Sequence, residues 1–180
     1  MHIAICGAPG AGKSTVQKIL YDEFSVHPVD DGRILRDIAI QSFGLTEEQV
    51  TSEQGKNSYI EFLNQKWQIR QILGEIGKSL ENIFSEHIIP HLTIQKHCVN
   101  EKHNYSFGSV RRSQPQYFNK IGGIVIEVIR KGCTPKYDFD EYTGKIDFTI
   151  INNGTLEELK QQINNIFHKI STRGKHEIFS

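Results

Sequence analysis

A short segment near the start of the chain has the residue types and spacing needed to hold a phosphate chain. Gly7 to Ser14 reads GAPGAGKS, a full match to the pattern GxxxxGK[ST], between an apolar run and an amphipathic one. The glycines let the backbone turn so that successive N–H groups point at one phosphate, and a following helix adds its positive end. An ordinary glycine-rich turn is the alternative, and the flanking pattern argues against it. The predicted nucleotide-binding residues are Gly7, Ala8, Pro9, Gly10, Ala11, Gly12, Lys13, Ser14 and Thr15.

Two side chains of this segment have separate predicted tasks. Lys13 would place a positive charge between the β- and γ-phosphates, where negative charge shifts during phosphoryl transfer. Ser14 offers a hydroxyl to Mg²⁺, which prefers oxygen ligands. The expected cofactors are therefore ATP and Mg²⁺, with Lys13 catalytic and Ser14 the protein's ligand to the metal.

The segment VDDGRILR is a candidate site for the acceptor of the phosphoryl group. Asp30 and Asp31 follow the second predicted strand, where ligand crevices open in parallel sheets. Either carboxylate could orient an acceptor hydroxyl or a metal-bound water, and we assign Asp30 to catalysis and Asp31 to the substrate. Arg33 and Arg36 lie three apart on the next helix and could hold an acceptor phosphate. An N-cap aspartate followed by two solvated arginines is an equally good interpretation.

A stripe along the middle helix is a second candidate for substrate binding. Arg70, Gly74, Gly77 and Glu81 recur at helical spacing beside the apolar face, with Lys78 adjacent. A glycine inside a helix costs about 1 kcal/mol relative to alanine, so two on one stripe indicate that something comes close. Either a ligand or a neighbouring helix would fit, and the flanking Arg70 and Lys78 favour a ligand.

A polar segment after the fourth predicted strand could cover the bound phosphates. It begins with Arg130, Lys131 and Gly132 and runs to Tyr142. A lid over residues 130–142 would exclude water from the site, with Arg130 as a catalytic cation. A plain surface loop with two exposed cations is the alternative.

Short apolar runs alternate with longer amphipathic stretches, which is typical of an α/β protein. We therefore predict a three-layer α/β/α fold around a parallel sheet of about five strands. The predicted strands are His2 to Cys6, Ser25 to Asp30, Tyr105 to Val110, Ile124 to Ile129 and Ile146 to Ile151.

Helices are predicted from the period of the apolar residues. One carries Val16 to Phe24, and the clearest runs from Ile69 to Phe84. The last begins at Thr155, which forms a capping box with Glu158, and we expect a loose chain beyond Ser171.

Composition limits the classes of protein to which the chain can belong. With 180 residues we expect one domain over 1–180. Lysine plus arginine and aspartate plus glutamate each total 21, so no overall basic field favours nucleic acid. No CxxC pair occurs among Cys6, Cys98 and Cys133, which indicates reduced thiols. No targeting or membrane segment is evident. We expect a cytoplasmic protein whose partner is a small-molecule nucleotide acceptor, without nucleic acid or membrane. The sequence leaves open whether the chain forms a homodimer.

The order of the segments resembles the P-loop deoxynucleoside monophosphate kinase-like family of phages and bacteria. The resemblance implies an ATP- and Mg²⁺-dependent nucleotide kinase, and it makes Arg70 and Arg111 phosphate or substrate ligands and places Arg130 near ATP. The matching segments are GAPGAGKST, DDGRILRDIAIQSFGLTEEQV, RQILGEIGKSLE, VRRSQPQYFNKIGGIVIEVIRKG and IDFTIINNGTLEEL.

The chain departs from that family at one functional position. Where the family has an aspartate before VR, this chain has Gly108-Ser109, followed by RRSQPQ, so a Walker-B-like carboxylate is missing. Asp30 or Asp31 could replace it, as in the similar dephospho-coenzyme A kinases. We expect phosphoryl transfer to a nucleoside or deoxynucleoside monophosphate. The alternatives are a dephospho-coenzyme A kinase-like or other small-molecule kinase, and a non-catalytic ATP-binding regulatory module.

Overall fold

The structure, a computed structural model, describes residues 1–135 and 140–176. It consists of two compact units, one formed by Met1–Val29 with Asn100–Ser180 and the other by Asp30–Val99. We call them the sheet unit and the helical unit and describe each by itself. The expectation of one domain over residues 1–180 stays a prediction.

The sheet unit contains five parallel strands in the order β2-β5-β1-β6-β7. This confirms the predicted parallel five-stranded sheet. Because the strands are parallel, the carboxyl ends of β1, β2 and β5 lie at one edge. The bounds are β1 (His2–Cys6), β2 (Val26–Val29), β5 (Asn104–Phe107), β6 (Ile124–Ile129) and β7 (Phe148–Ile151).

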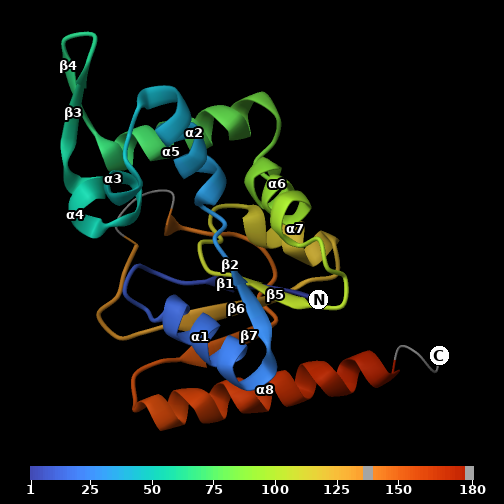
Figure 1. The fold of residues 1–180 in the computed structure, drawn as a ribbon. Helices are drawn as coiled ribbons and strands as arrows, with labels where there is room; N and C mark the ends of the chain where they lie inside the picture. The colour runs from blue at the N-terminus through green and yellow to red at the C-terminus, as the bar shows by residue number, and fades with distance from the viewer. Residues whose placement is uncertain (136–139, 177–180) are drawn as a thin grey trace. The chain divides into compact units, whose positions relative to one another are not determined.

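Helices cover both faces of this sheet, which gives the predicted three layers (Figure 1). On one face α1 (Lys13–Phe24) and α8 (Leu156–His176) pack against β1, β6 and β7 in a single apolar core. On the other face lies α7 (Gln114–Lys120), whose Phe118 ring packs against Phe107 in a tilted arrangement with 4.8 Å between centroids. Apolar burial on both sides explains why these strands are apolar at nearly every position.

The last helix is longer than expected. Thr155 and Glu158 exchange both hydrogen bonds of the predicted capping box, at 2.8 and 3.2 Å. The expectation of a loose chain beyond Ser171 is wrong for residues up to His176, where α8 ends. The hydroxyls of Ser171 and Thr172 donate back to the carbonyls of the preceding turn, which lets the helix accommodate them.

The helical unit contains five helices and has a small apolar core of its own. The predicted middle helix is present as α5 (Ile69–Ile83), and the helix after Asp31 as α2 (Arg33–Phe43). The core residues are Ala39, Leu45, Val50 and Ile69. The other elements are α3 (Glu47–Thr51), α4 (Glu53–Asn57), α6 (Ile88–His97) and the hairpin of β3 (Tyr59–Phe62) and β4 (Gln65–Gln68).

Within the part of the chain that the structure describes, none of the helices has the length and apolar character needed to cross a membrane.

Candidate functional site

The glycine-rich segment forms a loop directly after β1 whose backbone lies against the neighbouring strand. Gly7 has φ 144°, and a Cβ there would overlap the carbonyl oxygen of Val128 in β6. Gly12 has φ 105°, and a Cβ there would overlap the amide of Asn152. Both positions therefore require glycine, because the backbone conformation and the close approach each exclude a larger residue.

Lys13 is the first residue of α1, and its ammonium group turns back onto the loop. Nζ donates to the carbonyl oxygens of Gly7 at 2.7 Å and Ala8 at 3.1 Å. Gly12, the N-cap, provides no side-chain hydrogen bond, so no side chain from that position competes with an anion for the first-turn N–H groups. Ser14 and Thr15 are exposed in that first turn. The loop thus has the shape, the donors and the charge of a phosphate-binding site.

Two asparagines after β7 support this region, and sequence reasoning missed them. The side chain of Asn152 donates to the carbonyl oxygen of Ala11 at 2.8 Å, and its backbone N–H donates to Ile129 at 2.8 Å. The side chain of Asn153 accepts from the N–H of Lys131 at 2.6 Å. The signal that could have found them is a polar pair directly after an apolar parallel strand.

A side-chain amide lies beside Gly108, one of the two residues found where the carboxylate is missing. A Cβ on Gly108 would overlap the side-chain oxygen of Gln17, which projects from α1. The Gln17 amide nitrogen donates to the carbonyl oxygen of Ser106 at 3.0 Å and lies 3.4 Å from its hydroxyl. A carboxylate at position 108 would fit only if the Gln17 side chain moved away.

Arg111 lies in the sheet unit shortly after β5, beside a buried carboxylate. Its Nη1 is 3.9 Å from an oxygen of Asp140, a residue only 6% exposed. Its N–H donates to the side chain of Gln114 at 3.1 Å. Gln114, the buried first residue of α7, therefore fixes the backbone of Arg111, and both residues belong to the RRSQPQ run.

Arg130 is exposed and directly follows β6, where its carbonyl accepts from the N–H of Cys133 at 3.0 Å. The proposed lid over residues 130–142 falls partly outside the described residues, because 136–139 are not among them. Its role stays a prediction.

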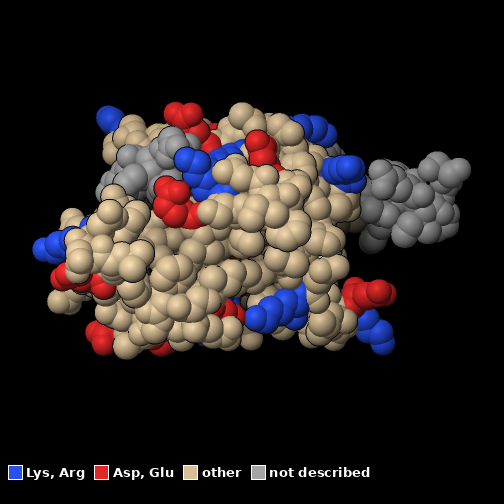
Figure 2. All heavy atoms as spheres, turned by 90° about the horizontal axis from the view of Figure 1, so that it is seen from above, with Lys and Arg blue, Asp and Glu red and all other residues tan. Residues whose placement is uncertain are grey.

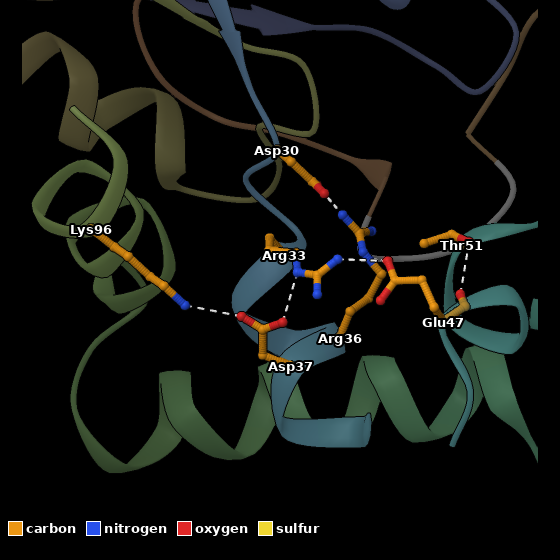
Figure 3. Close-up of polar contacts among 7 residues, drawn as sticks. All are labelled: Asp30, Arg33, Arg36, Asp37, Glu47, Thr51 and Lys96. Carbon is orange, nitrogen blue, oxygen red and sulfur yellow. Dashed lines mark hydrogen bonds and ion pairs between the residues drawn. The ribbon is translucent and has the colours of Figure 1, made fainter. Parts of the chain in front are cut away.

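In the helical unit the acidic pair and the two arginines do not converge on one point. Arg36 donates through Nη2 to the carboxylate of Asp30, and its guanidinium lies over Gly32 (Figure 3). Arg36 Nε is buried without a hydrogen-bond partner among the described residues. The N-cap of α2 is Gly32, without a side-chain hydrogen bond, so the interpretation of an N-cap aspartate is wrong. Asp31 is 8% exposed.

Arg33 belongs to a separate network that links three helices (Figure 3). It pairs with Asp37 at 2.7 Å and with Glu47 at 2.6 Å, while Lys96 reaches Asp37 from α6 at 3.0 Å. The hydrogen bond from Lys96, with that from Arg33, lowers the pKa of Asp37 despite partial burial. Figure 2 likewise shows basic side chains lying next to acidic ones on the face that it draws.

The glycine stripe of α5 has a structural explanation at one of its two positions. A Cβ on Gly77 would lie 3.3 Å from the side chain of Leu35, so α2 is what comes close, and the preference for a ligand is wrong there. Nothing lies within 4 Å of the equivalent atom on Gly74. Arg70 pairs with Glu53 at 2.7 Å and Asn57 at 3.2 Å, whereas Lys78 is exposed.

No group of three or more His, Cys, Asp or Glu side chains among the described residues could hold a metal ion. The exposed hydroxyl of Ser14 is an oxygen donor of the kind that Mg²⁺ accepts together with phosphate oxygens and water.

Comparisons with known proteins agree with this picture of the fold. No protein-family model matches the chain. An adenylate kinase from Geobacter sp. (strain M21) is 25% identical over an alignment of 133 positions that covers 56% of this chain. The chain spans only 62% of that relative's length.

Solved structures with the same arrangement include a dephospho-CoA kinase from Campylobacter jejuni, with TM-score 0.55 and 15% identity over 96% of this chain and 98% of that one. A shikimate kinase from Aquifex aeolicus vf5 gives TM-score 0.46 and 17% identity over 97% and 98%. The first likeness shows the fold alone, a three-layer α/β/α arrangement with a five-stranded parallel sheet.

Proposed function

We propose that the chain is an ATP-dependent kinase that transfers the γ-phosphoryl group to a nucleoside or deoxynucleoside monophosphate. The observation that carries this proposal is the loop between β1 and α1, with Lys13 at its end and glycine required at positions 7 and 12. The similarity to an adenylate kinase supports a nucleotide as the acceptor. The finer assignment to the deoxynucleoside monophosphate kinase-like family rests on the sequence resemblance.

The loop's own residues would do most of the work by positioning and charge. The carbonyl oxygens of Gly7 and Ala8 hold the Lys13 ammonium group near the loop, so only a side-chain rotation is needed to bring it onto phosphate oxygens. Backbone N–H groups of the first turn would bind the β-phosphate, and Ser14 would hold Mg²⁺. Fixed donors stabilise the charge that develops during transfer without reorganising water.

Arg36 supports a phosphorylated acceptor. A buried guanidinium N–H without a partner costs free energy, and a phosphate oxygen would satisfy it. The side chain keeps a second donor on Asp30, which fixes the plane of the guanidinium. Arg33 is a weaker candidate because two carboxylates already hold it. We keep Asp31, Arg70, Lys78 and Arg111 as proposed substrate ligands, and Asp30 and Arg130 as proposed catalytic residues.

A dephospho-coenzyme A kinase-like activity is the second candidate, favoured by the adjacent Asp30 and Asp31 after β2. A hydroxyl acceptor would need a carboxylate as a base more than a phosphate acceptor would. A regulatory module that binds ATP without transfer is the third, favoured by the Gln17 amide beside Gly108, where the carboxylate is missing.

Incubation with ATP and Mg²⁺ and a panel of acceptors separates these functions. The panel contains nucleoside and deoxynucleoside monophosphates, dephospho-coenzyme A and shikimate, with ADP release and the mass of the product as readouts. We expect a nucleoside diphosphate as the product. A phosphorylated hydroxyl compound would support the second candidate, and ATP binding without any acceptor-dependent ADP would support the third.

A further inference from the structure

A strained arginine lies next to Arg111. Arg112 has φ 49°, in the left-handed region that a residue with a side chain seldom adopts. Two backbone hydrogen bonds of 2.7 Å hold it, from its own N–H to the carbonyl of Glu141 and from the N–H of Thr143 to its carbonyl. Residues 140–143, which we call the strap, therefore pair with this arginine as a short parallel bridge.

A side-chain hydrogen bond fastens the strap to β6, the strand beside the central strand β1. The hydroxyl of Tyr142 donates to a carboxylate oxygen of Glu127 in β6 at 2.5 Å, and Thr149 lies 3.4 Å from the other oxygen. Burial, followed by the contact with Glu127, raises the pKa of Tyr142, so the hydroxyl stays a donor at neutral pH. Glu127 is paired in register with Cys6, the residue that immediately precedes the phosphate-binding loop. The strap is thus fixed at the level of the sheet where that loop begins.

Several buried polar residues accompany the two arginines. Ser113 and Gln114 are each 8% exposed and Asp140, the first strap residue, is 6% exposed. Polar groups in such positions cost free energy unless they are satisfied, and a satisfied network fixes a single geometry. Gln114 fixes the backbone of Arg111, and Asp140 lies beside its guanidinium. Strain and buried polarity are here concentrated on one pair of adjacent cations, a combination typical of functional sites.

We propose that Tyr142 and Glu127 are positioning residues that hold the Arg111–Arg112 pair for binding of a phosphate group, with Arg112 acting beside Arg111. Two arginines at successive positions can together donate several hydrogen bonds, which suits a phosphoryl group whose charge is spread over several oxygens. The role of the arginine pair rests on the proposed function. The fastening of the strap by Tyr142 and Glu127 does not.

Removal of one hydroxyl tests the proposal. Tyr142→Phe keeps the ring and deletes the hydrogen bond to Glu127, and we expect kcat/KM for the acceptor to fall about tenfold, as for loss of one hydrogen bond to a charged group. Glu127→Gln keeps an acceptor oxygen and should retain more activity than Glu127→Leu. Tyr21→Phe, in a half-exposed tyrosine of α1, is the matched control and should stay near wild type. Unchanged kcat/KM in Tyr142→Phe would overturn the proposal.

Amide hydrogen exchange separates failure of this inference from failure of the proposed function. In Tyr142→Phe, and not in Tyr21→Phe, the N–H groups of Arg112 and Thr143 should exchange faster, whether or not the protein has kinase activity. If the wild type transfers phosphate to no acceptor, the proposed function fails. The exchange experiment then still tests whether Tyr142 and Glu127 fasten the strap. Equal protection in both variants would overturn it.

Discussion

The side chain of Asn152 donates a hydrogen bond of 2.8 Å to the carbonyl oxygen of Ala11, so the residue that directly follows β7 supports the phosphate-binding loop from 141 positions away in the sequence. The same amide occupies the space that a Cβ on Gly12 would need. The second half of the loop is therefore shaped by a residue that the loop's own sequence pattern does not include.

Gly12→Ala should weaken ATP binding by more than backbone strain alone explains. The added methyl group would displace the Asn152 amide, whereas Gly122→Ala meets nothing within 4 Å at a comparable φ of 75°. Both variants carry strain of about 1 kcal/mol, and only the first distorts the loop. Calorimetry with ATP and Mg²⁺ should show a loss of affinity of tenfold or more in Gly12→Ala alone. Equal affinities in the two variants would show that Asn152 does not shape the site.

Substitution of the two arginines of α2 should have different consequences. Arg36→Met removes the buried, unpartnered Nε and should raise KM for the acceptor by about tenfold, since a charged hydrogen bond to phosphate is lost. Arg33→Met removes partly exposed ion pairs to Asp37 and Glu47 and should lower the free energy of unfolding by up to about 1 kcal/mol. Acceptor kinetics and thermal melts of both variants give the comparison. A larger rise in KM for Arg33→Met would reverse the two roles.

Cys98 should react slowly with reagents that attack thiolates. Burial raises its pKa from 9.0 to about 11, so near pH 8 the thiolate fraction is about a hundredfold smaller than in the unfolded chain. Since the raised pKa favours the protonated form in the fold, this contribution to stability is present below about pH 9 and is lost as the pH rises toward 11. Alkylation by iodoacetamide, followed at the peptide level in native and urea-unfolded protein, measures the ratio. Equal rates at Cys98 would contradict the burial of this thiol.

The parallel strands and the helices α1, α5 and α8 could be predicted because each has a strong apolar period or a specific cap. The hairpin of residues 59–68 could not, because its turn residues Leu63 and Asn64 adopt φ 52° and 60° without the glycine that usually marks such a turn. Helix α6 begins with two isoleucines and Pro90 and has no amphipathic period to reveal it.

The residues of the candidate site likewise divide into those that could be predicted from the sequence and those that could not. The phosphate-binding loop is a local pattern, so its residues could be named from the sequence. The contacts of Asn152, Gln17 and Tyr142 depend on strand order and on long-range packing, which a local pattern does not contain. The separate roles of Arg33 and Arg36 depend on carboxylates from other elements, so their spacing on one helix did not reveal them.

Lys13→Ala should abolish phosphoryl transfer while the fold stays intact. The ammonium group donates to the carbonyl oxygens of Gly7 and Ala8, and loss of such part-buried hydrogen bonds costs about 1 kcal/mol each, so the variant should stay folded. Acceptor-dependent ADP release and a circular dichroism melt check both expectations. Turnover like that of the wild type would rule out the proposed role of Lys13.

Isothermal titration calorimetry of the wild-type chain with ATP, in the presence of Mg²⁺, tests the central claim most directly. The loop after β1 predicts saturable binding with one nucleotide per chain, strongly weakened in Lys13→Ala. Absence of detectable heat with both ATP and GTP, in a protein that melts cooperatively, would contradict the account.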